Sequence, residues 1–323
     1  RLRSRGLGDV YKRQFKHKGY LEPLEKNVMT EEVRDSFPQK YLESICEENG
    51  HIYSVPFQMD IMMFWVNQEL LKQAGLDEIK NTGDFDILQK SLKNPDQYAY
   101  GDAWENTHVY NSLSQFVNFW GGDYFDWTDP KTKDAARYMK SMLDEKNTSP
   151  AQFVDQYEQM EEKFIRGKYG CVFMYTSALG TFLDADVYGK NKIHMAPLPV
   201  LHKKKATNIA TWQYVLNNAS ENKDAAVRFL QYAAGYEGST EYAKIMKSYP
   251  ARVDVIENED IDLEGIDMIR KYLREYTLNA RPLCENSMGA VSDMGKLFQG
   301  YVLGQCEEDS FFEQAQNCIN TYY

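Results

Sequence analysis

The chain has 323 residues, of which 43% are hydrophobic and 26% charged, so it has enough apolar material for substantial cores and a length that favours two domains. Its formal net charge of −11 argues against nucleic acid and anionic membranes as partners, because both attract basic surfaces. The five cysteines show no CxxC spacing and predict no zinc or dithiol site; buried free thiols are expected, with a Cys306–Cys318 disulfide as the alternative.

Residues 1–14 (RLRSRGLGDVYKRQ) differ in character from the rest of the chain. They hold five basic side chains and one acidic side chain, and they lack the apolar stretch of a signal peptide. The string resembles a translated adapter or an assembly artefact, so we exclude it from the fold. On this interpretation the native N-terminus is missing, and the absence of a signal peptide carries no information about location.

Helix and strand patterns alternate along the chain, which predicts an α/β fold. Residues 51–57 are typical of a strand that reaches a proline, and the apolar run 61–67 fits either a strand or a buried helix. Asn67 is placed to cap a following helix. A helix is expected over 110–120, with Trp120 on its buried apolar face.

The rest of the chain continues the alternation. Helices are expected after Asp129 and Pro130 and again after Ser149 and Pro150, where proline suits the first turn. Further strands are expected at 171–176, 192–199 and 209–217, and further helices at 224–234, 267–276, 289–303 and 309–322. The strand at 171–176 is apolar nearly throughout, as expected of a strand that is covered on both faces.

Four segments carry a family resemblance through their order and spacing. They are GHIYSVPFQMDIMMFWVNQELLKQAGL; FVNFWGGDYFD with the downstream FIRGKYGCVFMYT; APLP with IATWQYVLNNASENKDAAVRFLQYAA; and YPARVDV with RPLCEN. Together they resemble family 1 of the extracellular solute-binding proteins of ABC importers, the group of the maltose- and oligosaccharide-binding proteins. The likeness covers residues 15–323, but the family's first strands and helices have no counterpart here. Trp65-Val66-Asn67 stands where the family usually has Tyr-Asn.

The resemblance implies a two-lobed periplasmic-binding-protein-like fold of class II, in which each lobe is a mixed sheet flanked by helices and a hinge joins the lobes. Lobe 1 is expected at 15–56 and 208–253, and lobe 2 at 57–207 and 254–323. The implied function is reversible capture of a mono- or oligosaccharide between the lobes and its delivery to an ABC permease. The protein is expected to be extracellular or periplasmic, anchored as a lipoprotein, and monomeric.

Four candidate ligand residues lie near the expected crossings between lobes. The resemblance places Asp60 where a family acid faces the ligand, with a helix cap as the alternative, and Gln58 is its neighbour. Trp212 lies in the strand that returns to the first lobe and is a candidate for stacking on a sugar. Arg252 could donate hydrogen bonds to a ligand or could pair with Asp254 instead.

Four further candidates belong to the expected second lobe. Tyr110 and Asn111 begin the helix at which family members present an aromatic ring, although Asn111 could serve only as a cap. Tyr175 ends the strand at which an aromatic side chain commonly stacks on the sugar, and Ser177 follows it. The alternative for Tyr175 is a core tyrosine with a bonded hydroxyl group.

No catalytic or metal-binding pattern is present in the sequence. HExxH, GxSxG, GxxxxGK[ST] and GxGxxG are all missing, and the five histidines show no metal-ligand spacing. We therefore expect no enzyme activity, no cofactor and no metal. The alternatives are a secreted carbohydrate-active or esterase-like hydrolase, a sensor that docks a signalling partner, and a binding protein for a polyamine, a glycerophosphodiester or a metal complex.

The expected absence of the family's first strands generates a stability prediction. A first lobe without these strands exposes sheet edges and loses core, so the 323-residue chain should be unstable or should aggregate. Thermal unfolding followed by circular dichroism measures this. A sharp, cooperative melt that shifts with ligand would contradict the prediction.

Overall fold

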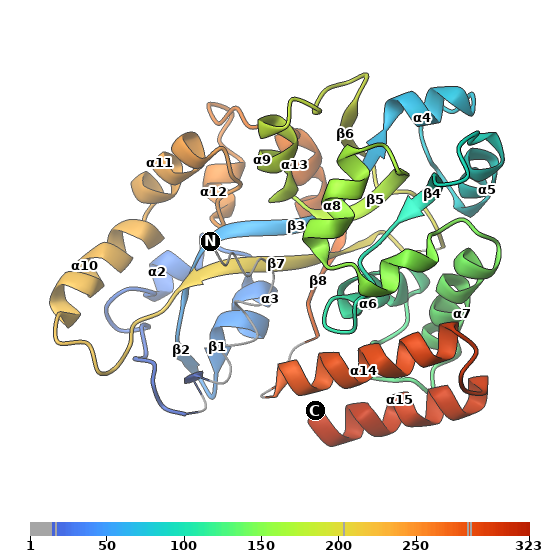
Figure 1. The fold of residues 1–323 in the computed structure, drawn as a ribbon. Coiled ribbons are helices and arrows are strands. Elements are labelled where there is room, and N and C mark those ends of the chain that lie inside the picture. Colours follow the sequence, from blue (N-terminus) through green and yellow to red (C-terminus); the bar gives the residue numbers. More distant parts are fainter. Residues whose placement is uncertain (1–14, 17, 203, 283, 285) are drawn as a thin grey trace. The chain divides into compact units, whose positions relative to one another are not determined.

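The computed structural model describes residues 15–323 except 17, 203, 283 and 285. The expectation for residues 1–14 therefore lies outside the described residues. The chain forms two compact units: unit 1 contains the described residues up to Ile61 and from Ile209 to Asn286, and unit 2 contains Met62–Asn208 and Ser287–Tyr323. Strand β3 (Val55–Asn67) and strand β7 (Ala206–Tyr214) each contribute to both units (Figure 1).

Unit 2 is built around the second half of β3. The apolar run 61–67 is a strand. It pairs antiparallel with β5 (Tyr169–Tyr175) and with β6 (Ile193–Ala196). Strand β4 (Tyr98–Gly101) pairs in parallel with β5. Every residue of β5 is buried, as its continuous apolar sequence predicts. The Trp65 indole of β3 donates a hydrogen bond to the carbonyl oxygen of Met174 in β5 at 2.9 Å. This side-chain bond supports the register in which the two strands pair.

Helices flank these strands. They are α4 (Gln68–Gln73), α5 (Thr82–Ser91), α6 (Val109–Trp120), α7 (Pro130–Asp144), α8 (Tyr157–Ile165), α9 (Ala178–Asp184), α14 (Ser287–Val302) and α15 (Glu308–Tyr322). Local sequence signals set several ends: the Asn67 side chain accepts hydrogen bonds from the amides of the first turn of α4, and Gly121 ends α6 with a left-handed φ of 72°. Trp120 is buried, as expected.

The helix expected after Ser149 is divided. A 3₁₀ segment, Pro150–Val154, comes first, and α8 begins only at Tyr157. The division occurs because Asp155 and Gln156 have extended backbones, and the Gln159 side chain accepts a hydrogen bond from the Gln156 amide to start the new helix. Tyr157 therefore stands in the first turn of a helix rather than in its middle.

Unit 1 contains the first half of β3, most of β7, and short strands and helices. The strands are β1 (Glu47–Glu48), β2 (His51–Ile52) and β8 (Thr277–Ala280); the helices are α2 (Glu31–Arg34), α3 (Gln39–Tyr41), a π-helical turn (Leu42–Cys46), α10 (Lys223–Ala234), α11 (Tyr236–Met246), α12 (Val253–Ile256) and α13 (Ile266–Glu275). In the six-stranded sheet the order is β4-β5-β3-β7-β8, with β6 paired to β3.

The division of the chain differs from the expected one in residues 254–286, which were assigned to lobe 2 but belong to unit 1. The reason is tertiary packing. Helix α12 packs against α11, the Arg270 guanidinium donates to the carbonyl oxygens of Ile256 and Asn258 at 2.8 Å each, and β8 lies next to β7 in the sheet. The first change of unit falls after Ile61 rather than after Pro56.

All five cysteines lie among the described residues and are free thiols, so the disulfide alternative does not apply. Four are buried and Cys306 is half-buried. Complete burial raises the pKa of Cys171. Among the described residues, no helix combines the length and the apolar character needed to cross a membrane.

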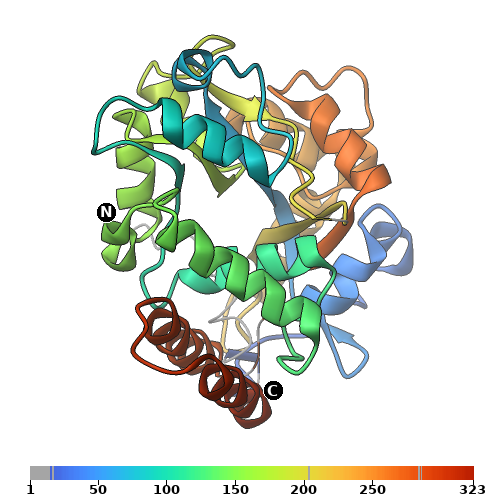
Figure 2. The ribbon, with the colours of Figure 1, turned by 90° about the vertical axis from the view of Figure 1, so that its right-hand side faces the viewer.

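Helices α14 and α15 are the last two elements of unit 2 in sequence order, and they lie side by side (Figures 1 and 2). Gly295 faces the interior: a Cβ atom at this position would collide with the backbone carbonyl group of Asn106. Gly300 lies on the same helix, and the atom nearest to an added Cβ is the Gln305 Oε1 at 4.0 Å. The two glycines therefore form a matched pair for testing the packing.

We expect Gly295→Ala to lower the free energy of unfolding by about 1–3 kcal/mol, because the added methyl group must displace backbone. Gly300→Ala should be neutral or should stabilise by up to about 1 kcal/mol, because alanine favours helix. Urea unfolding followed by circular dichroism measures both. Equal effects of the two substitutions would show that α14 does not pack in this way.

Candidate functional site

In unit 1 three of the four candidate residues lie on one face of the β3–β7 pair. Gln58 lies opposite Trp212, and Asp60 lies opposite Ala210, so these side chains share a face. A β-bulge at Phe57 precedes them, because Pro56 pairs with Gln213 and Gln58 pairs with Trp212. The register of β3 with β7 therefore brings together the Gln58 amide, the Asp60 carboxylate and the Trp212 indole.

Tyr242 of α11 joins this group, although the sequence did not single it out. Its hydroxyl group donates to the Gln58 Oε1 at 2.7 Å. Burial raises the pKa of Tyr242 to about 12, and the negative charge of Asp60 contributes to the shift. Asp60 is itself only 5% exposed. Asp60 lies within β3, so it does not cap a helix.

Arg252 is turned toward other parts of unit 1. Its guanidinium donates to both carboxylate oxygens of Asp254, at 3.0 and 2.6 Å. It also donates to the carbonyl oxygen of Ala234 at 2.8 Å and to the Ser36 hydroxyl at 2.7 Å. Pairing with Asp254, the alternative stated from the sequence, is present, and the structure gives Arg252 a role in joining α10 to the segment around Ser36.

In unit 2 the candidates Asn111 and Tyr175 are in direct contact. The Tyr175 hydroxyl donates to the Asn111 Oδ1 at 3.2 Å, and the Asn111 amide donates to the carbonyl oxygen of His108 at 3.0 Å. Asn208 donates to the backbone carbonyl of Asn111 at 2.9 Å. Asn111 lies in the first turn of α6, whose N-cap is His108, so it does not cap this helix. The bonded hydroxyl group stated as the alternative for Tyr175 is present, and Tyr175 is buried.

The other candidates of unit 2 flank this contact. Tyr110 is the neighbour of Asn111 on α6 and is buried. Ser177 is half-buried and directly precedes α9, and no hydrogen bond from its side chain caps that helix. The structure thus places all four candidates of unit 2 at two positions, the start of α6 and the end of β5.

Two further side chains, Tyr157 and His108, extend the group. The Tyr157 ring lies edge-on to Tyr175 with centroids 6.2 Å apart, and the His108 ring lies edge-on to Tyr157 at 5.7 Å. His108 Nδ1 is 3.0 Å from Glu105 Oε2. Burial alone would raise the pKa of Glu105, but hydrogen bonds from Thr107 and His108 outweigh it and lower the pKa.

A buried carboxylate, Asp102, supports the start of α6. Its two oxygens accept four hydrogen bonds: from Ala103 N at 2.7 Å, the Ser112 hydroxyl at 2.5 Å, the Tyr100 hydroxyl at 2.6 Å and the Trp104 indole at 2.9 Å. Complete burial raises the pKa of Asp102 against the effect of these donors. The arrangement ties β4 to α6 and so holds the helix that carries Asn111.

None of the described residues form a group of three or more His, Cys, Asp or Glu side chains able to hold a metal ion. The chemistry of the two groups is instead that of recognition. Aromatic faces suit apolar C–H surfaces, and the carboxylate, amide and hydroxyl groups suit hydroxyl-rich ligands.

The family profile described as bacterial extracellular solute-binding protein matches residues 7–240, well over half of the sequence. The chain belongs to this family. Its fold agrees: a solved ABC transporter solute-binding protein from Thermotoga lettingae, bound with α-D-tagatose, matches with a TM-score of 0.84 and 18% identity. That match covers 97% of this chain and 83% of the other. The predicted family and the predicted two-lobed periplasmic-binding-protein-like α/β fold are therefore confirmed.

Two curated relatives are similar in sequence. A probable amino-acid ABC transporter periplasmic-binding protein, y4oP of Sinorhizobium fredii, is 24% identical over 239 residues, which cover 70% of this chain and 54% of that protein. The arabinooligosaccharide-binding protein of Bacillus subtilis is 23% identical over 273 residues, which cover 79% and 62%. The matches thus span between half and two thirds of each relative's length.

The Asp102 cluster can be tested by an isosteric change. Each Asp102 oxygen accepts from one N–H group, and an N–H group cannot become an acceptor, so Asp102→Asn sets its amide against one of them. We expect a loss of about 2–3 kcal/mol in the free energy of unfolding. Asp184→Asn, at the exposed end of α9, is the control and should change stability by less than about 0.5 kcal/mol. Equal stabilities in urea would contradict the assignment.

Proposed function

We propose that the protein is the solute-binding subunit of an ABC importer that captures a mono- or oligosaccharide reversibly and delivers it to a permease. The observation that carries the proposal is the face of β3–β7 on which Asp60, Gln58 and Trp212 lie together, in a chain of the solute-binding family. The Tyr175–Asn111 contact in unit 2 supplies a second aromatic and polar group.

The energetics of such capture are compatible with these residues. A Kd near 1 μM corresponds to about −8 kcal/mol. Each ring that stacks on a sugar face contributes through apolar burial, and each hydrogen bond to a charged group contributes about 1.5–3 kcal/mol. Trp212 and Tyr175 are the rings for stacking, and Asp60 accepts from sugar hydroxyl groups. Tyr110 and Ser177 complete the set in unit 2.

The family name and the tagatose-bound structural relative support a carbohydrate and a site of action outside the cytoplasm. In the proposal the protein works as a monomeric lipoprotein and has no catalytic role. An amino acid is the second candidate ligand, because the relative from Sinorhizobium fredii is named for amino-acid transport. Ligand screening separates the two, since one class must shift the melting temperature and the other must not.

The central experiment is a calorimetric and thermal-shift screen of mono- and oligosaccharides, with amino acids and polyamines alongside, on the full-length gene product. We expect micromolar binding of a sugar, and a loss of affinity of about ten- to a hundred-fold in Asp60→Asn, because a charge-assisted hydrogen bond is removed. Tyr175→Leu should weaken binding by about tenfold through loss of stacking.

Tyr323→Leu, at the exposed end of the chain, is the matched control and should bind the sugar as the unmodified protein does. Catalytic turnover of a sugar would refute the proposal. So would a response to another solute class with no response to any sugar.

A further inference from the structure

A buried hydrogen-bond network joins α6 to the first residues of β7 within unit 2. Asn208 stands at its centre. Its side-chain amide donates to the backbone carbonyl of Asn111 at 2.9 Å and to the Ser114 hydroxyl at 2.8 Å. Its Oδ1 accepts from the Asn118 amide at 2.8 Å. Asn208 is fully buried, and the proposed function gives it no role.

The side chain of Gln115 completes the connection between α6 and β7. Its Oε1 accepts from the backbone N–H of Asn208 at 2.7 Å, and its Nε2 donates to the carbonyl oxygen of Ala206 at 3.3 Å. The Gln115 amide thus binds the strand as a peptide group of a neighbouring parallel strand would. Gln115 is fully buried too. Both the backbone and a side chain of β7 are therefore tied to the helix.

The network specifies more than packing alone requires. A helix and a strand can pack through apolar side chains, and replacing both partners of a buried hydrogen bond by apolar groups can leave stability nearly unchanged. A satisfied buried network instead favours one geometry, because a small shift leaves amide groups without partners at a cost in free energy. Gln115 and Asn208 therefore set the position of α6 more closely than an apolar contact would.

The network leads to a candidate ligand residue. Asn111 is held at two points, because its carbonyl oxygen accepts from Asn208 and its side-chain amide donates to the carbonyl oxygen of His108 at 3.0 Å. Its Oδ1 accepts from the Tyr175 hydroxyl at 3.2 Å. A continuous chain of hydrogen bonds therefore runs from Asn118 through Asn208 and Asn111 to Tyr175.

We infer that Asn208 is a positioning residue for sugar binding, because it sets the place of the Tyr175 ring through Asn111. The inference rests on the proposed function, in which Tyr175 stacks on the sugar. Asn208 has no contact with the sugar itself. Its amide holds the first turn of α6, and that turn holds the phenol. Without the amide, the sugar must order the ring as it binds, which lowers the affinity.

The experiment compares Asn208→Ala with Thr132→Val, a control on α7 in the same unit. Thr132 is fully buried and its hydroxyl donates to the carbonyl oxygen of Asp123 at 2.9 Å, so this change also leaves a buried group without its partner. Both variants should melt at a lower temperature than the unmodified protein. A loss of stability alone leaves the Kd of the folded protein unchanged, so Kd separates positioning from a purely structural role.

Calorimetric titration of the folded variants measures Kd, with D-tagatose, maltose and arabinotriose as probes. Asn208→Ala should weaken sugar binding by about three- to tenfold, because ordering one side chain costs about 0.5–1.5 kcal/mol. Thr132→Val should bind within about twofold of the unmodified protein. Equal Kd values for the two variants would overturn the inference.

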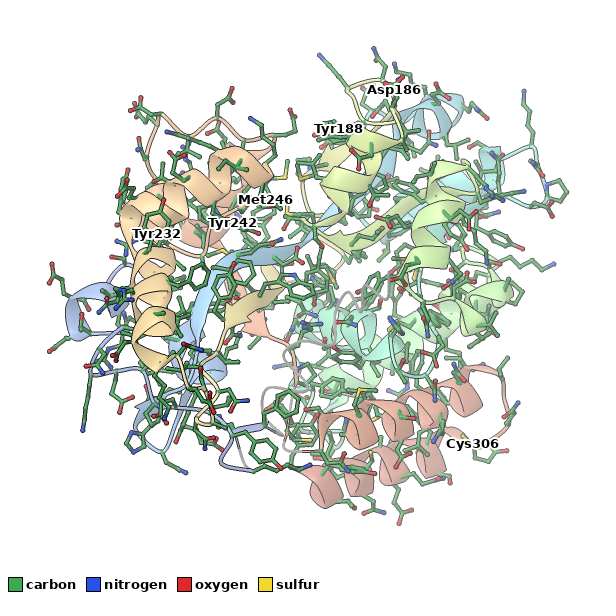
Figure 3. The ribbon with its side chains drawn as sticks, turned by 60° about the vertical axis from the view of Figure 1, so that its left-hand side comes forward. Asp186, Tyr188, Tyr232, Tyr242, Met246 and Cys306 are labelled. Carbon is green, nitrogen blue, oxygen red and sulfur yellow. The ribbon has the colours of Figure 1, made fainter. Side chains whose placement is uncertain are left out.

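A second measurement needs no ligand. In protein with ¹³C-labelled tyrosine, the NMR signal of the Tyr175 ring carbon that bears the hydroxyl group is assigned through Tyr175→Leu. The signal should shift in Asn208→Ala, because the acceptor of the hydroxyl moves, and should keep its position in Thr132→Val. Tyr232, half exposed on α10 in unit 1, is the reference and should not shift in either variant (Figure 3). An unchanged Tyr175 signal in Asn208→Ala would contradict the inference.

The remaining outcomes are also decisive. If the unmodified protein binds none of the probes, the sugar proposal fails, and the Tyr175 signal still shows whether Asn208 positions the ring. If Asn208→Ala does not fold, Asn118→Ala replaces it, since Asn118 is only half-buried and donates to the Asn208 Oδ1. This variant should shift the Tyr175 signal and weaken sugar binding by at least about twofold. No change in either would refute the assignment.

Discussion

The antiparallel pairing of β3 with β7 is the constraint on which the rest of the structure depends. Both strands contribute to both units, and their register decides which side chains share a face. Asp60, Gln58 and Trp212 come together only because this register holds. The β3–β7 pair also carries Tyr214, which stacks on Phe57 with ring centroids 4.1 Å apart.

Local signals allowed much of the fold to be predicted. The Asn67 cap, the left-handed Gly121 and the apolar run of β5 act within a few residues of the elements that they define, so no tertiary information was needed. Several of the elements that were missed lack such signals. β4 and β8 are short, and α11 follows α10 with only Gly235 between them. The position of residues 254–286 depends on packing against α11 and β7, which no local pattern encodes.

The residues of the candidate site differ in how far the sequence could predict them. The family resemblance led to Asp60, Trp212, Asn111 and Tyr175, because motif order fixes their place in the chain. Tyr157 and Tyr242 could not be separated from core tyrosines by spacing, since a ring on a helix face looks the same in sequence whether it meets the core or another functional group. Arg252 shows the converse: its residue type fits ligand binding, yet two carboxylate oxygens already hold it.

The bulge at Phe57 has a consequence for reading related sequences. Side chains in a strand alternate between faces, and one extra residue reverses the alternation for every position beyond it. In a relative without the bulge, the acid that corresponds to Asp60 therefore lies one position closer to the proline. An alignment that places no gap at Phe57 pairs residues on the Asp60 face of one protein with residues on the opposite face of the other. A specificity inferred from such columns would be assigned to the wrong side of the sheet.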